Sequence, residues 1–484
     1  MNRKKYYIAL VFLAFFGCTN KFNDLVSDPS AVNQASPGSF LNSILIDGVN
    51  AGLSRSHTIN NELTQVTVSL AEVASARVHR YILPPSEAYL WNNYYLVLTD
   101  ADNMYQKAEE YNDNNYKAIA MTLKAWLFQN LTDIYGDIPY KQALRGYSDY
   151  LLQPRFDTQQ AIYQDLIKQL DEANALYDDK KALTLGADIL YNADNAANAT
   201  TIATNITKWK KFTNSLRLRV LMRVEGKYPQ APQLIQEMLA DPVKYPLMTN
   251  LNDGASLKYT GTTPLINPFS TYRDNDFSGN RGMGEFFINK LNSWEDPRLG
   301  IWCSQVGGIY AGVPSGYSEI ESEEVRGKPS SRLNIGLKNS SQLGSIMQYA
   351  EVEFLLAEAA LRGYIADNPE DHYKKGVTAS LSYWGATVPT DFFDRSGVKF
   401  DGSLEQIMTQ KYFSLFFIDM QQWFEIRRTG YPVLPKGNGM ENNKELPSRL
   451  KYPLSLQSLN LENYNAAVAR MGGDEISTKV WWQQ

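Results

Sequence analysis

The chain has 484 residues, of which 44% are hydrophobic and 20% are charged. This composition is typical of a folded protein and argues against a disordered one. A formal net charge of -5 argues against a nucleic-acid partner, which would require a broad basic surface. Thirty Tyr and nine Trp stand out, because their flat rings with polar tips suit sugar or peptide surfaces.

The first residues have the pattern of a secretory signal. Basic residues at positions 3–5 precede an apolar run, Tyr6 to Phe16, which ends at Gly17 and Cys18. This run is about 11 residues long, shorter than the roughly 20 that a membrane-spanning helix needs, so cleavage is expected. A small residue before Cys resembles a bacterial lipobox, although Phe15 stands where an aliphatic residue is usual. We predict a signal peptide over residues 1–17 and lipidation of Cys18; the alternative is a plain signal peptide with an incidental cysteine.

Residues 18–39 are polar and aperiodic, which predicts a lipidated tether. We expect the remainder, 40–484, to form a single domain. Cys303 is the only other cysteine, so an acylated Cys18 leaves no internal disulfide. Cys303 lies in an apolar run and is expected to be a small core residue.

Helical periodicity dominates the first half of the domain. Apolar residues recur three and four positions apart, as in the stripe Trp91, Tyr94, Leu98, Ala101, Tyr105 and Ala108. Similar stripes predict helices over 116–134, 159–177 and 209–224. Gly136 and Gly226 have the positions of helix C-caps.

The second half changes character. Residues 245–343 are rich in Gly, Pro, Asn and Ser and predict an irregular region, with a hairpin turn at Gly307-Gly308. Helices are then expected over 346–364 and over 404–428, the latter ending at Gly430. Because 404–428 is hydrophobic nearly all round, it should be deeply buried. The fold class predicted is all-α: a tetratricopeptide-like superhelix of hairpins, mainly in 40–226 and 344–430, with a loop-rich region and a few short strands.

Seven short segments, in order along the chain, resemble the SusD/RagB family: Asp133 to Tyr140 (DIYGDIPY), Asn214 to Arg219 (NSLRLR), Asp296 to Leu299 (DPRL), Tyr349 to Ala359 (YAEVEFLLAEA), Trp423 to Pro432 (WFEIRRTGYP), Arg449 to Pro453 (RLKYP) and Gly472 to Asp474 (GGD). Each is weakly diagnostic alone, but their order and extent are specific. The resemblance supports the helical-hairpin fold.

The resemblance also implies a function. Members of this family are outer-membrane lipoproteins of Bacteroidetes that capture oligosaccharides, or peptides in some branches, for a SusC-like TonB-dependent transporter. We therefore expect a lipid-anchored, cell-surface nutrient-binding protein without enzymatic activity or cofactor. Surface-exported relatives often carry acidic residues after the lipidated cysteine; this chain instead has Thr19 to Asp24, with a single acidic residue.

Ligand contacts should come from aromatic and planar polar side chains on loops. The first candidate region, 77–91, supplies Arg80, Tyr81 and Trp91, although core packing is the alternative for Trp91. A second, 267–281, supplies Tyr272, Arg273 and Asp274, with Tyr310 joining it; a solvated loop is the alternative there.

Other charged residues are expected to be structural. Arg217, Arg219 and Arg223 alternate on an apolar helix, which predicts ion pairs with neighbouring hairpins in preference to anion binding. Glu351, Glu353 and Glu358 share one helix, where ordinary Glu is the better interpretation than a metal or acid–base site. The three histidines form no zinc or hydrolase motif, so no catalytic residue or metal ligand is predicted. Glycoside hydrolysis stays open, since it needs only two carboxylates.

Overall fold

A computed structural model describes residues 35–71, 77–146 and 148–484 of the chain. The predicted signal peptide, Cys18 and most of the predicted tether lie outside these residues. Within the described part, Pro37–Gln484 forms one compact unit. It begins with a helix at Gly38, two residues before the predicted start of the domain.

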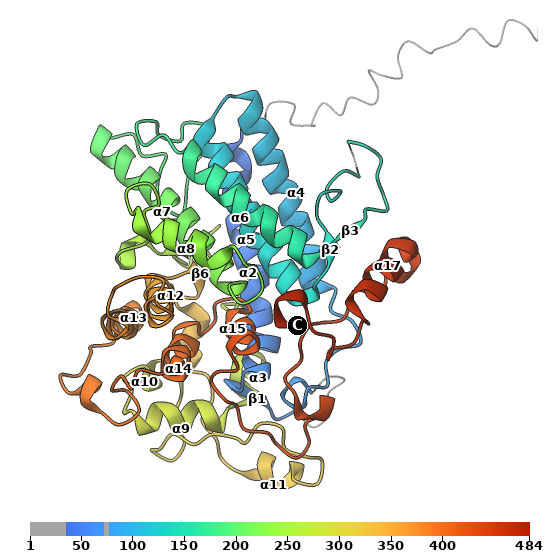
Figure 1. Ribbon diagram of the computed structural model, residues 1–484. Helices are drawn as coiled ribbons and strands as arrows, with labels where there is room; N and C mark the ends of the chain where they lie inside the picture. The colour runs from blue at the N-terminus through green and yellow to red at the C-terminus, as the bar shows by residue number, and fades with distance from the viewer. Residues whose placement is uncertain (1–34, 72–76, 147) are drawn as a thin grey trace, which may run out of the picture. The chain divides into compact units, whose positions relative to one another are not determined.

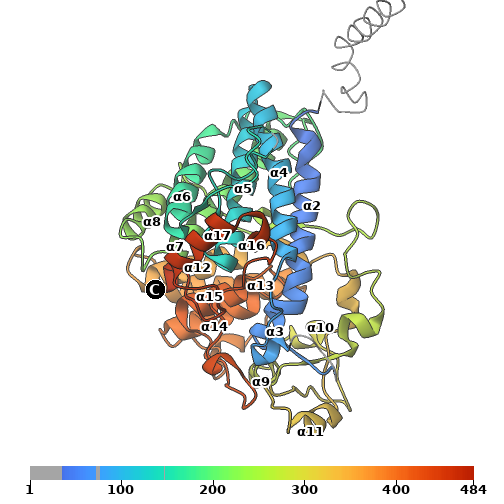
Figure 2. The same ribbon diagram turned by 90° about the vertical axis from the view of Figure 1, so that its right-hand side faces the viewer.

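Helical hairpins build the first half, as predicted (Figure 1). Consecutive helices pack against each other, and α2 lies beside α4 along its length before it reaches the loop-rich half near α9 and α10 (Figure 2). The predicted stripe on α4 is buried apart from the partly buried Tyr105. The helices are α2 (Gly38–Arg55), α3 (Asn61–Leu63), α4 (Tyr89–Glu110), α5 (Asn114–Tyr135), α6 (Gln159–Leu176), α7 (Ala199–Arg223) and α8 (Ala231–Ala240).

Local signals explain where these helices begin and end. The Asp113 carboxylate accepts hydrogen bonds from the backbone at the start of α5, and the Thr158 hydroxyl does the same for α6. Gly136 ends α5 with a φ of 84°, as predicted. The C-cap prediction for Gly226 is wrong: α7 ends earlier, at Arg223, and its C-cap is Val224.

The second group of helices comprises α12 (Tyr349–Leu361), α13 (Pro369–Tyr383), α14 (Leu404–Ser414) and α15 (Gln421–Thr429). The single helix predicted over 404–428 is wrong, because Phe417 and Asp419 have φ values of 62° and 33° and break it into α14 and α15. Its deep burial is confirmed. Ile346, predicted to be helical, lies in a strand instead.

Short elements fill the region 245–343, as expected. Its helices are α9 (Glu285–Ser293), α10 (Leu299–Trp302) and α11 (Ser322–Gly327). Val306 and Ile309 pair across the predicted Gly307-Gly308 turn, and Cys303 is buried in the core. The strands form three antiparallel pairs: β1 (Thr67–Ser69) with β5 (Arg281–Met283), β2 (Ile138–Pro139) with β3 (Phe156–Asp157), and β4 (Ala255–Leu257) with β6 (Gly344–Met347). The all-α fold class with a few short strands is confirmed.

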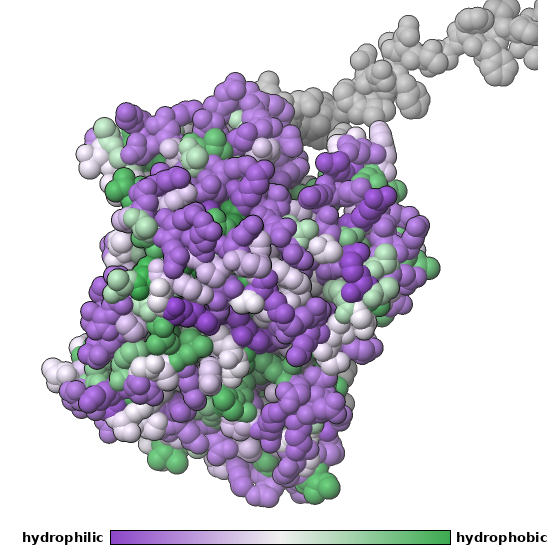
Figure 3. Space-filling view, viewed as in Figure 1, coloured by the Kyte–Doolittle hydropathy of each residue, from purple (hydrophilic) through white to green (hydrophobic). Residues whose placement is uncertain are grey.

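The C-terminal segment contains two helices that the sequence analysis missed, α16 (Leu456–Leu459) and α17 (Leu461–Met471). The apolar residues of α17 are spaced for a helix, which the sequence analysis did not recognise, and Ala467 is its one buried residue. The face of the molecule in Figure 3 is mostly hydrophilic, with apolar residues more frequent in its lower half. Every helix in the described residues is too short or too polar to cross a membrane.

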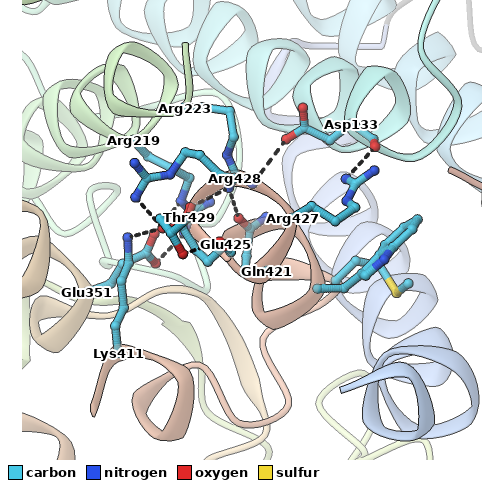
Figure 4. A network of polar contacts seen from close by, with 12 residues as sticks. Asp133, Arg219, Arg223, Glu351, Lys411, Gln421, Glu425, Arg427, Arg428 and Thr429 are labelled. Atoms are coloured by element: carbon cyan, nitrogen blue, oxygen red, sulfur yellow. Dashed lines mark hydrogen bonds and ion pairs between the residues drawn. The ribbon is translucent and has the colours of Figure 1, made fainter. Parts of the chain in front are cut away.

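An ion-pair network joins the hairpins at the centre of the unit (Figure 4). Arg219 on α7 contacts Glu351 on α12, while Arg223 reaches Glu425 on α15. Arg217 pairs with Asp171 on α6. The predicted structural role of the three arginines is therefore confirmed.

Candidate functional site

A groove of about 400 Å³ opens where the end of α2 meets the β1–β5 ribbon. The chain leaves α2 through a π-helical segment, Ser56–Asn60, a conformation that is frequent at functional sites. We call this cavity the Arg55 groove. It is lined by Arg55, Thr58, Ile59, Glu62, Ser69, Ala71, Val78, Pro84, Glu87, Asn280 and Arg281.

Two arginine–glutamate pairs provide the charge of the Arg55 groove. Arg55 Nε lies 3.0 Å from Glu87 Oε1, and Arg281 Nε lies 3.3 Å from Glu62 Oε1. Each arginine side chain is 21% exposed, whereas the glutamates are 8% and 4% exposed. The buried carboxylates thus hold two guanidinium groups in place, and these planar donors remain accessible to ligand oxygen atoms.

The carboxyl groups of Glu62 and Glu87 both accept hydrogen bonds from backbone N–H groups. Burial raises the pKa of Glu62, although Arg281 and the backbone N–H of His79 act against this shift. Glu87 accepts a 2.9 Å hydrogen bond from the N–H of Tyr89 at the start of α4. Both carboxyl groups are therefore occupied by protein donors.

An aromatic ring lies beside the groove. The Arg55 guanidinium is 3.9 Å from the centroid of the Tyr89 ring, and Tyr89 is 36% exposed. Exposed aromatic rings next to planar donors are suited to the apolar faces and hydroxyls of sugars.

Trp91, a predicted ligand contact, is only 8% exposed. Its ring packs edge-on against Tyr135 and Tyr452, with centroids 5.1 and 5.8 Å away. This packing supports the core alternative for Trp91.

Arg80 and Tyr81 lie in a junction of three loops, residues 77–82, 315–321 and 437–441, which we call the loop junction. Arg80 Nε donates to the Gly439 carbonyl at 2.9 Å, and the Arg80 carbonyl accepts from Glu441 N–H. Arg80 also pairs with Glu319 at 3.1 Å. Tyr81 is 4% exposed, so little of its surface is available to a ligand.

His79 ties the loop junction together. Its Nδ1 accepts a 3.2 Å hydrogen bond from Gly316 N–H, and its ring stacks on Tyr317 with centroids 4.7 Å apart. Burial, followed by the charges of Arg80 and Arg77, lowers the pKa of His79 to about 3. The ring is therefore neutral at physiological pH, as an Nδ1 acceptor must be.

The second predicted region lies on the surface. The side chain of Arg273 is 84% exposed and pairs with Asp276, that of Asp274 is 75% exposed and pairs with Lys338, and Tyr272 is 37% exposed. This segment continues through residues 275–279 to Arg281 of the Arg55 groove. Tyr310 is partly buried and its carbonyl accepts from Asn292; no hydrogen bond, ion pair or ring contact among the described residues joins it to Tyr272–Asp274.

Two further cavities lie apart from the Arg55 groove. One of about 540 Å³ lies on the Tyr81 side of the loop junction. Another, of about 890 Å³, lies between α8 and the turn from α12 to α13 and contains none of the predicted residues. Beside it, His372 contacts Glu353 at 2.7 Å and Asp367 at 3.0 Å.

Sequence reasoning chose none of Arg55, Glu62, Glu87 and Arg281, although Glu87 falls in the first predicted region, 77–91, and Arg281 ends the second, 267–281. They come from three distant segments, and no motif links such residues before the chain is folded. Tyr89 was within the first predicted region but was not chosen.

Comparison with known proteins gives the family. Residues 29–453 match the SusD-like family model, described as starch-binding associating with outer membrane, and the chain belongs to this family. The resemblance seen in the sequence is thereby confirmed. No curated protein sequence matches the chain.

Solved structures agree with the fold. A SusD homologue from Bacteroides fragilis is 24% identical, with a TM-score of 0.77 over 93% of this chain and 100% of the other. A structure described as a chitin-binding protein is 27% identical, with a TM-score of 0.73 over 93% and 100%. A chitin-binding SusD homologue from Flavobacterium johnsoniae is 19% identical, with a TM-score of 0.76 over 93% and 98%.

Proposed function

We propose that this chain is a cell-surface lipoprotein that binds an oligosaccharide and delivers it to a SusC-like TonB-dependent outer-membrane transporter. The Arg55 groove is the observation that carries this proposal, because it combines fixed guanidinium donors with an exposed ring. The family's description as starch-binding and associated with the outer membrane supports it.

The groove is suited to binding a sugar without transforming it. Arg55 and Arg281 donate to hydroxyl oxygens, and the Tyr89 ring covers an apolar sugar face. Tyr272, Arg273 and Asp274 extend the contact surface along the segment that leads to Arg281, while Tyr310 supplies a separate contact. Arg80 and Tyr81 contribute by fixing the loop junction.

Calorimetric titration with a panel of neutral oligosaccharides, including starch and chitin fragments, tests the binding site. Arg55→Ala should weaken binding about tenfold or more, since a hydrogen bond to a charged group contributes about 1.5–3 kcal/mol. Tyr89→Ala should weaken binding about two- to twelvefold, since a stacked aromatic ring contributes about 0.5–1.5 kcal/mol. Tyr111→Ala is the matched control, because Tyr111 is 46% exposed at the other end of α4. If all three variants bind the oligosaccharide as tightly as the unmodified protein, the ligand binds elsewhere. If the protein binds only peptides, the class of ligand is different.

A glycoside hydrolase is the alternative that the groove keeps open, because Glu62 and Glu87 are two carboxyl groups in one cavity. Prolonged incubation of the protein with each bound oligosaccharide should return it intact. Product released over many turnovers, and abolished by Glu62→Gln, would favour the hydrolase.

The anchor and the partner need separate measurements. Mass spectrometry of the mature protein should find residue 18 at the N-terminus with an acylated Cys18 thiol. Purification from outer membranes should recover a TonB-dependent transporter, and a Cys18→Ala variant should be released from the membrane fraction. An unmodified cysteine would contradict the lipoprotein.

A further inference from the structure

The cavity of about 540 Å³ on the Tyr81 side of the loop junction has an unusual charge. Four cations line it, together with the single carboxylate of Glu445: Arg427, Lys436, Lys444 and Lys479. Its volume is within the range of small-molecule sites. We call it the basic cavity.

The cations are only partly neutralised by the protein. Glu445 pairs with Lys436 at 2.6 Å. Within the described part of the chain, no carboxylate lies within ion-pair distance of Arg427, Lys444 or Lys479. An anionic ligand would therefore meet several unpaired positive charges in a concave site, where attraction is stronger than on a flat surface.

Arg427 is the most constrained of these cations. It donates to the carbonyls of Ser448 and Asp133 and stacks over Trp423, 3.9 Å from the ring centroid. Burial lowers the pKa of Arg427 to about 9, so the group still carries its charge at physiological pH. The protein thus holds this cation at the edge of the cavity through backbone carbonyls and an aromatic ring; the charge of Asp133 acts on it, but among the described residues no carboxylate lies within ion-pair distance.

The backbone that presents Lys444 is strained. Asn442, Asn443 and Lys444 have φ values of 54°, 55° and 58°, three successive residues in the left-handed region. Asparagine tolerates this region, but lysine adopts it at a cost, and residues held in this way concentrate at functional sites. The turn is anchored to the loop junction through Glu441, whose N–H donates to the Arg80 carbonyl.

The rest of the lining favours a saccharide over a bare ion. The lining also includes Asn442, Asn443, Ser448, Ser477 and Gln483, residue types whose amide and hydroxyl groups can pair with sugar hydroxyls. Tyr81 lines the cavity as well, on the loop that also contributes Val78 and Pro84 to the Arg55 groove.

We propose that the basic cavity is a subsite for the carboxylate or sulfate group of an acidic oligosaccharide, an inference that rests on the proposed function. Starch and chitin fragments lack such a group, so the basic cavity would give this chain a preference for charged glycans.

Matched ligand pairs test the subsite. Galacturonate, glucuronate-containing and sulfated oligosaccharides are titrated into the purified chain at about 50 mM salt, each beside its methyl-esterified or desulfated form. At least one acidic ligand should bind tenfold or more tightly than its neutral form. Lys444→Gln/Lys479→Gln should remove this preference while leaving affinity for the neutral form unchanged.

A double variant with the same loss of charge is the control. Lys180→Gln/Lys227→Gln removes two exposed lysines outside the basic cavity and should keep the preference. Equal affinity for every acidic and neutral pair would overturn the subsite while leaving the proposed function intact, provided that neutral ligands still bind. Binding of penta-glutamate but of no acidic saccharide would also overturn it.

Discussion

Arg219 and Glu351, which lie 132 positions apart, form two 2.6 Å contacts between α7 and α12 in the centre of the molecule. Their side chains are 1% and 2% exposed. Glu351→Gln would leave the guanidinium buried without its counter-charge, so we expect a loss of about 3–5 kcal/mol in the free energy of unfolding. Urea denaturation followed by tryptophan fluorescence measures it.

The control for this prediction is Glu172→Gln on α6. Glu172 pairs with Lys168 at 3.3 Å, but their side chains are 51% and 72% exposed. An exposed pair contributes little, so the change should stay within about 0.5 kcal/mol. Similar losses in the two variants would mean that the buried pair does not hold the hairpins together.

Substitutions of Trp91 and Tyr89 should have different effects, the first on stability and the second on ligand binding. Trp91→Ala removes a ring packed against Tyr135 and Tyr452, and we expect a loss of about 3–5 kcal/mol in stability. Tyr89→Ala should cost about 1 kcal/mol or less but weaken the oligosaccharide affinity. If Trp91→Ala is stable and fails to bind, Trp91 is a ligand contact as the sequence analysis first predicted.

Acid should destabilise the loop junction through His79. The pKa of His79 is lowered from 6.5 to about 3 in the fold, so the unfolded chain takes up a proton first as the pH falls. The free energy of unfolding should therefore decrease between pH 6.5 and 3, by about 1.4 kcal/mol per pH unit for this group. Burial also lowers the pKa of His57 to about 3, so His57 contributes a further decrease in the free energy of unfolding as the pH falls.

His79→Asn keeps an acceptor for Gly316 and removes the titration, so its stability should fall less steeply from pH 7 to 5. The effect of His372 on the pH dependence of stability has the opposite sign. Burial lowers the pKa of His372, but its hydrogen bonds to Glu353 and Asp367 outweigh burial and raise the pKa above its usual value. Its contribution is present below pH 6.5 and is lost as the pH rises through the folded value. His372→Gln should consequently remove the gain in stability between the folded pKa and pH 6.5, and leave the slope below pH 6.5 unchanged. An unchanged slope in His79→Asn would contradict the assignment.

Gly430 and Gly226 offer a test of backbone conformation. Gly430 ends α15 with a φ of 78° and has open space around it, so Gly430→Ala should cost about 1–2 kcal/mol through backbone strain alone. Gly226 also has open space but no left-handed φ, and Gly226→Ala should be neutral or stabilise by about 0.4–1 kcal/mol. Thermal unfolding compares the two variants directly.

The sequence predicted the positions of several helices but not every helix end. Apolar periodicity located α4, α5 and α6 to within about two residues, because a buried stripe must recur with the helical period. Periodicity cannot detect the break at Phe417 and Asp419, since both segments around it are buried on every side. Glycine alone likewise does not specify the left-handed conformation.

The candidate site was less predictable for a different reason. Arg55, Glu87 and Arg281 become neighbours only when α2, α4 and the β1–β5 ribbon are packed together. Aromatic and charged residues in a loop gave the correct neighbourhood, residues 77–91, but their exposure decides which of them can meet a ligand. Tyr89 and Trp91 are two positions apart and differ in that property.

Asn60, just before α3, donates a 2.8 Å hydrogen bond to Gln422, 362 positions later, and accepts one from the Trp423 N–H. The ribosome synthesises Gln422 and Trp423 long after Asn60, so the early helical hairpins can form before these partners exist. The loop junction also stays incomplete until residues 437–441 have been synthesised. A truncated chain that ends before α15 would consequently have a helical first half but an incomplete loop junction. The segment around Asn60 would lack its partners and be exposed, so we expect proteases to cleave the truncated chain there.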